Sequence, residues 1–147
     1  MAAFANTIAS IYSDRRGWAL GGLVSFRAVA RGGDFTVWLA APSAMQSFGE
    51  GCSPQWDCRS GRDIIINDER WQTGSPKWPG SLGDYRTMIV NHETGHWLGF
   101  DHALCPAAGA PAPIMMQQSK GVGACLPNPW PTASEREAAR SMLRARL

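Results

Sequence analysis

The histidines of this chain are concentrated in one short segment. All three fall within residues 92–102, which read H-E-T-G-H-W-L-G-F-D-H. His92 and His96 are four residues apart, so on a helix both side chains lie on one face and both imidazoles can bind one metal ion. Gly99 can adopt the positive φ that turns the chain back after a helix, which lets His102 supply a third nitrogen. The spacing therefore predicts a metal centre of His92, His96 and His102, and we expect Zn²⁺ as the cofactor.

Glu93 is the second kind of reactive residue in the segment and directly follows the first histidine. Three nitrogen ligands leave a fourth position on Zn²⁺ for water, whose pKa the ion lowers from about 15.7 to about 7 in favourable sites. Glu93 can accept a proton from this water as it attacks a peptide carbonyl, and can return it to the leaving amine. The segment therefore predicts a zinc-dependent endopeptidase with Glu93 as general base and then general acid.

Length and composition restrict the class of protein. A chain of 147 residues suits a single domain, 1–147, with one hydrophobic core. No apolar run reaches the ~20 residues that span a bilayer. The net charge of +2 is too small to indicate binding to nucleic acid or to an anionic membrane. We therefore expect a monomer that binds a peptide or protein substrate and neither nucleic acid nor a membrane.

Four cysteines in a loop-rich chain indicate disulfide bonds and an oxidising compartment. Of the three possible pairings, Cys52–Cys58 and Cys105–Cys125 are favoured because each closes a local loop. The alternative is a set of four reduced or metal-binding thiols in the cytosol. Residues 1–10 do not have the pattern of an export signal, and we expect a secreted or extracytoplasmic domain separated from its signal.

The pattern of apolar residues predicts both helices and strands. Helical spacing of the apolar positions predicts an N-terminal helix over 4–12. Alternation predicts strands over 23–29 and 34–40, and an uninterrupted apolar run predicts a buried strand over 63–67. We therefore expect an α+β fold.

Two further helices are expected in the C-terminal half. Residues 84–100 suit one long helix that carries His92 and His96, and Gly99 ends it as a glycine does after a last helical turn. Residues 132–147 open with T-A-S-E, which is the pattern of a capping box. A C-terminal helix is therefore expected to follow.

The segment H-E-T-G-H-W-L-G-F-D-H is similar to the extended metal-binding motif of the metzincin clan of zinc endopeptidases. Members of that clan also have a turn with a methionine beneath the metal. Residues 113–118, P-I-M-M-Q-Q, resemble this Met-turn, with Met115 as the better match and Met116 as the second. The resemblance implies a zincin fold in which a small twisted mixed sheet accompanies N-terminal, active-site and C-terminal helices.

Almost the whole chain is closer still to a bacterial family of uncharacterised secreted snapalysin-like domains. The similar segments include D-R-R-G-W at 14–18, C-S-P-Q-W-D-C-R-S-G-R at 52–62, Y-R-T-M-I-V-N-H-E-T-G-H at 85–96 and residues 105–131. This resemblance implies Zn²⁺ and the two local disulfides. It also implies that a substrate peptide lies near the strand at 34–40 or the loop after it. The strand that usually precedes the first helix of such domains is missing or lies outside this chain.

Two other functions are compatible with the same segment. A zinc hydrolase could cleave a different amide, such as a cell-wall peptide cross-link. A non-catalytic domain could use the metal for binding alone, with Cys105 as a fourth ligand if its thiol is free. The presence of Glu93 argues against the second function, because a purely structural site has no use for a carboxylate at that position.

Overall fold

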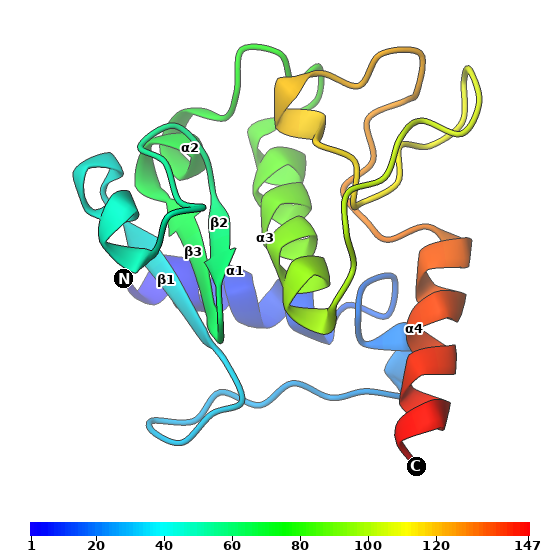
Figure 1. Cartoon of the computed structure of the whole chain (residues 1–147), viewed down its shortest axis with the longest axis horizontal. Helices are drawn as coiled ribbons and strands as arrows, with labels where there is room; N and C mark the ends of the chain where they lie inside the picture. The colour runs from blue at the N-terminus through cyan, green and yellow to red at the C-terminus, as the bar shows by residue number, and fades with distance from the viewer.

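A three-stranded mixed sheet and a long central helix form the frame of the computed structural model, which describes residues 1–147 (Figure 1). The strands are β1 (Thr36–Ala40), β2 (Cys58–Ser60) and β3 (Asp63–Asn67), in the order β1-β3-β2. β3 pairs in parallel with β1 and antiparallel with β2. The three isoleucines at 64–66 are fully buried, which explains the uninterrupted apolar run. The expected α+β architecture with a small mixed sheet is confirmed.

The central helix α3 (Leu82–Leu98) carries two of the three histidines. Ser81 caps its N-terminus by accepting a hydrogen bond of 3.1 Å from the N–H of Asp84. Gly99 ends it in the left-handed conformation, with φ at 106°. Residues 88–95 are buried without interruption, because the sheet lies on one side of α3 and the C-terminal loops lie on the other (Figure 1). The expected long helix and its end at Gly99 are confirmed.

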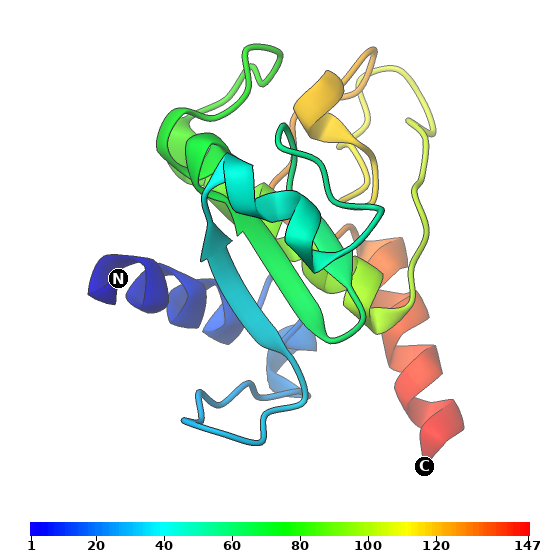
Figure 2. The same cartoon turned by 60° about the vertical axis from the view of Figure 1, so that its left-hand side comes forward.

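Helices α1 (Ala2–Ser13) and α4 (Ala133–Arg146) lie at opposite sides of this frame (Figure 2). α1 buries the apolar residues whose spacing predicted it, namely Phe4, Ile8, Ile11 and Tyr12. α4 begins with the expected capping box, in which Thr132 accepts from the N–H of Glu135 and Glu135 accepts from the N–H of Thr132. Both terminal helices are therefore confirmed.

The strand expected over 23–29 is wrong. This segment is irregular and lies between a short 3₁₀ turn (Leu20–Gly22) and β1. Val24 and Phe26 still pack on the core, and the Phe26 ring stacks on Tyr12 with centroids 4.7 Å apart. The alternation thus predicted which side chains point inward. The backbone lies outside the three-stranded sheet, and a strand requires a neighbour for its ladder of hydrogen bonds.

Two short elements escaped the sequence analysis. β2 has three residues, which is too short to show alternation. α2 (Asp68–Thr73) starts directly after β3 and is capped by Asn67, whose side chain accepts from the N–H groups of Glu69 and Arg70. Both elements lie next to β3, because β2 pairs with it and α2 continues the chain from its end.

Both favoured disulfides are present, with Cα–Cα distances of 5.4 Å for Cys52–Cys58 and 5.8 Å for Cys105–Cys125. No cysteine is free. Cys105 therefore has no thiolate to offer a metal, and that version of the binding-only alternative is wrong. Two disulfides indicate an extracytoplasmic or secreted protein. None of the helices has the length and apolar character required to cross a membrane.

Candidate metal centre

The side chains of the three histidines converge, and they do so through the Nε2 atoms of their rings. His96 Nε2 lies 3.2 Å from His92 Nε2 and 3.1 Å from His102 Nε2. Nitrogen ligands of a tetrahedral zinc ion lie roughly 3.3 Å apart, as follows from Zn–N bonds of about 2.0–2.1 Å. The possible ligand atoms of all three residues lie within 4.8 Å of one another. The structure therefore brings together the three ligands that the sequence predicted.

Hydrogen bonds to backbone carbonyls orient two of the rings. His92 Nδ1 donates to the carbonyl oxygen of Ile114 at 2.7 Å, and His96 Nδ1 donates to that of Phe100 at 2.8 Å. Because a carbonyl only accepts, each Nδ1 carries the proton and each Nε2 of a neutral ring presents a lone pair. Burial lowers the pKa of His92 to about 4 and also lowers the pKa of His96, so both rings are neutral at pH 7.

This arrangement of donors fits a metal ion. The lone pairs of His92 Nε2 and His96 Nε2 face each other at 3.2 Å and repel unless a cation lies between them. His92 is buried, His96 is partly buried and His102 is exposed, so the cluster opens from the core toward solvent. Three imidazole nitrogens with one open side could therefore hold a metal ion.

The left-handed turn after α3 brings His102 back toward the helix. The N–H of Phe100 donates to the carbonyl of Gly95, and the N–H of Ala103 donates to the carbonyl of Met115, both at 3.0 Å. The residues around His102 are therefore fastened to the helix on one side and to the C-terminal loop on the other.

Met115 lies against the buried side of α3, next to the turn that carries His96. Its side chain is 2% exposed, and a Cβ atom added at Gly95 would collide with Met115 Sδ. Trp18 packs against the same glycine and donates from Nε1 to the carbonyl of Asn91 at 2.9 Å. Gly95 is therefore required by a close approach between helix and loop. The resemblance to a Met-turn predicted Met115, whereas no pattern in the sequence marked Gly95.

Glu135 connects the loop that carries Met115 to α4. Its Oε2 accepts from the N–H of Ile114 at 2.9 Å, and its Oε1 accepts from the N–H of Met115 at 3.0 Å. The carbonyl of the same Ile114 accepts from His92. A chain of hydrogen bonds thus connects the first turn of α4 to a predicted metal ligand. The capping box identified Glu135 as a helix cap, and no sequence pattern indicated its second contact.

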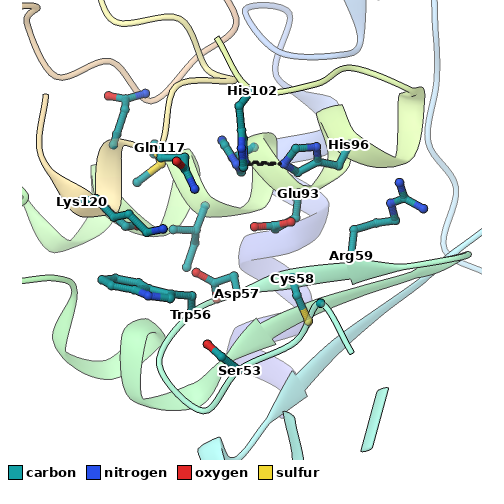
Figure 3. A pocket seen from close by; sticks show the side chains of 16 residues that line it. Ser53, Trp56, Asp57, Cys58, Arg59, Glu93, His96, His102, Gln117 and Lys120 are labelled. Carbon is teal, nitrogen blue, oxygen red and sulfur yellow. Dashed lines mark hydrogen bonds between the residues drawn. The ribbon is translucent and has the colours of Figure 1, made fainter. Parts of the chain in front are cut away.

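Glu93 faces a cavity beside the histidines (Figure 3). Its side chain is 7% exposed. Burial, and then the charge of Asp57, raise the pKa of Glu93 well above its ordinary value, while Arg59 acts in the opposite direction. Burial also raises the pKa of Asp57 to about 7, although its carboxylate accepts from the N–H of Asn67 at 2.7 Å. The cavity therefore contains two carboxyl groups that hold protons more readily than usual.

The cavity has a volume of about 320 Å³ and lies between the two disulfide-closed loops. One wall consists of β2 and the loop before it, with Ser53, Trp56, Asp57, Cys58 and Arg59. The opposite wall consists of residues 117–120, and α3 contributes Glu93 and the histidines. Of the two places expected for a peptide, the loop after β1 borders this cavity and β1 itself does not.

The model of the family described as "Protein of unknown function (DUF3152)" matches residues 1–131, most of the 147-residue chain. The chain belongs to the DUF3152 family. Among curated proteins and among solved structures, no match was found.

The DUF3152 match includes both disulfides, the histidines and every residue that lines the cavity. It ends before Glu135, which lies in the first turn of α4. The sequence analysis did not single out Trp56, Asp57, Arg59 or Lys120. The signals near the first three were the pair of cysteines at 52 and 58 and the resemblance of the whole segment 52–62, and no motif marked Lys120 individually.

Proposed function

We propose that this protein is a zinc-dependent endopeptidase in which His92, His96 and His102 hold the ion and Glu93 is the catalytic acid–base residue. The observation that carries the proposal is the convergence of three Nε2 atoms next to the open cavity that Glu93 faces. The donor set is suited to zinc, and the neighbouring carboxyl group is suited to proton transfer.

When bound, zinc supplies a Lewis acid that activates water and polarises the scissile carbonyl. Glu93 accepts the proton of the attacking water at a carboxylate oxygen. It then donates this proton to the nitrogen of the departing amine, which breaks the peptide bond without leaving a charged amide behind. The burial that raises the pKa of Glu93 favours holding the proton between these steps.

A metzincin-like arrangement is the finer part of the proposal. Three features support it: the glycine turn that returns His102 to the helix, the position of Met115 against Gly95, and the small mixed sheet beside α3. We propose that a peptide substrate lies along β2, whose one edge pairs with β3 and whose residues Cys58 and Arg59 border the cavity. The sequence led us to expect a peptide near the strand at 34–40 or the loop after it, and β2 directly follows that loop.

Metal analysis combined with cleavage of a peptide library tests the function. The purified protein is expected to retain about one zinc ion after dialysis and to cleave peptides. Glu93→Gln and Glu93→Ala should retain the ion and lose at least about 10²-fold in kcat, because proton transfer contributes about 10²–10⁴-fold. His102→Ala should instead lose metal, since one of three protein ligands is removed.

Two results would contradict this function. Undiminished turnover by the Glu93 variants would exclude the mechanism. Cleavage of purified cell-wall peptides but of no library peptide would support a zinc amide hydrolase instead. Circular dichroism spectra of Glu93→Gln and of the wild-type protein serve as the control. Equal spectra would show that a loss of turnover does not come from a loss of fold.

A further inference from the structure

The charged groups that border the cavity fall into two sets with different exposure. Glu93 is buried and Asp57 is partly buried, whereas Arg59 and Lys120 are exposed. The ion pairs of the protein involve other basic residues, so neither of these cations forms an ion pair with an acidic side chain. A ligand that enters from solvent therefore meets positive charge first.

The two cations lie on opposite sides of the catalytic group. In Figure 3, Lys120 and Trp56 lie to one side of Glu93 and Arg59 lies to the other. Lys120 Nζ is 5.9 Å from the centroid of the Trp56 ring, at the limit of a cation–π contact. An extended peptide whose scissile bond lies at Glu93 therefore passes one cation on each side of that bond.

The centre of the cavity has the opposite character. Glu93 is buried, and the carboxylate of Asp57 already accepts from the N–H of Asn67. A polymer with a charge on every backbone unit, such as RNA, would place phosphates against these carboxyl groups. A peptide has an uncharged backbone and carries its charges on side chains, so it can place negative charge at the two ends alone.

We propose that this cavity selects peptides with an acidic side chain on each side of the bond to be cleaved, with Lys120 and Arg59 as the partners of these side chains. This inference rests on the proposed peptidase function and adds its substrate class. The indole of Trp56, which lies beneath Lys120 in Figure 3, provides an apolar surface for the methylene groups of a glutamate.

Peptide binding tests the proposal without requiring turnover. Three fluorescent octapeptides differ only in the two residues that flank the central bond, which are both Glu, both Gln or both Lys. Their affinities for the zinc-loaded Glu93→Gln protein are measured by fluorescence anisotropy. We expect the Glu peptide to bind about tenfold more tightly than the Lys peptide, the size expected for two solvent-exposed ion pairs.

Charge variants in the same Glu93→Gln background assign this preference to residues. Lys120→Gln and Arg59→Gln should each reduce the ratio of the affinities for the Glu and Lys peptides about threefold. Lys120→Glu should reduce this ratio further, in favour of the Lys peptide. Lys120→Arg should retain it. The matched control is Lys77→Gln, because Lys77 is exposed and lies outside the cavity; its preference should equal that of the parent.

Several outcomes would overturn the proposal: equal binding of the Glu and Lys peptides, no binding of any peptide, or a preference that survives Lys120→Gln combined with Arg59→Gln. Tighter binding of a single-stranded RNA octamer than of the Glu peptide would also overturn it. Cleavage by the intact zinc-loaded protein is measured separately. Equal cleavage of all three peptides contradicts the selectivity alone, whereas a complete lack of cleavage of any library peptide contradicts the peptidase function.

Discussion

The loop closed by Cys52–Cys58 and the loop closed by Cys105–Cys125 border the same cavity from opposite sides. The first loop is short and is attached to the end of β3, where Asn67 donates to Asp57 and to the carbonyl of Pro54. It contributes Trp56 and Asp57 to the cavity. The hydrogen bonds that orient the rings of His92 and His96 do not involve this loop. The short loop therefore shapes the space for a ligand.

The long loop is attached at several points to distant parts of the chain. Glu135 binds two of its backbone N–H groups, and Gln118 exchanges hydrogen bonds with the backbone of Asn128. Tyr85 and Ser75 bind the residue at position 119. This loop also supplies the carbonyl of Ile114 that orients His92. The difference indicates that the side of the cavity with the histidines is held more firmly than the side formed by β2 and the loop before it, as the proposed metal ligands require.

Removing the longer disulfide is the strongest way to test this difference. Cys105→Ser combined with Cys125→Ser opens a loop with a sequence separation of 20 residues. We expect a loss of about 3 kcal/mol in the free energy of unfolding from chain entropy. We also expect weaker zinc binding, because the loop that orients His92 is released. Urea unfolding and competition with a chelator measure the two effects.

The matched variant opens the shorter loop, with a sequence separation of 6 residues. Cys52→Ser combined with Cys58→Ser should cost about 2 kcal/mol and should weaken peptide binding while leaving zinc affinity within about twofold. An equal fall in zinc affinity for both double variants would show that the two loops support the metal site alike, and the distinction between them would be lost.

Glu135→Gln tests, at a single residue, whether the attachment of the long loop supports the metal site. Glutamine keeps an acceptor for the helix cap but has one carbonyl oxygen where glutamate offers two charged oxygens to Ile114 and Met115. We expect a loss of about 1–2 kcal/mol in stability and about a tenfold fall in zinc affinity. Unchanged zinc affinity in a less stable protein would limit Glu135 to a role in the fold.

The control for this variant is Glu137→Gln on the same helix. Glu137 is exposed and pairs with Arg140 and Arg144 on the surface. Its removal should change stability by less than about 0.5 kcal/mol and should leave zinc affinity unchanged.

Residue spacing predicted the features whose two partners lie in one element or one loop. His92 and His96 share a helical face, Gly99 turns the chain within three residues, and each disulfide joins two consecutive cysteines that close a single loop. The same applies to the capping box of α4 and to the buried strand at 63–67. Spacing alone was sufficient for these features because both partners lie within one element or one loop.

Features whose partners lie in different elements or loops could not be predicted from spacing. The strand expected at 23–29 needed a neighbour that the fold does not provide. Gly95 is a glycine because Met115 approaches it from another loop, and the second contact of Glu135 joins α4 to a segment about twenty residues earlier. Such contacts depend on the tertiary arrangement, which periodicity and short motifs do not report.

The smallest expected effect concerns the pH response of the short loop. Burial raises the pKa of Asp57 from its ordinary value of 3.8 to about 7, so the folded protein binds this proton more readily than the unfolded chain does. The stability contributed by protonated Asp57 is therefore fully present below about pH 4 and is lost as the pH rises through about 7. Asp57→Asn cannot titrate and keeps an oxygen that accepts from Asn67.

The stability of Asp57→Asn relative to the wild-type protein should thus rise between pH 4.5 and 7.5. We expect a rise of only about 1 kcal/mol, because Asp57 is partly exposed and solvent screens its charge. Urea unfolding of both zinc-free proteins at matched pH measures this difference. The contributions of the histidines cancel, and the loss of the Asp57 charge, which raises the pKa of Glu93, changes the difference in the same direction. A difference that stays constant with pH would mean that Asp57 is ionised throughout. The short loop would then carry a permanent negative charge beside Glu93, and the preference for acidic peptides would be smaller than two free cations imply.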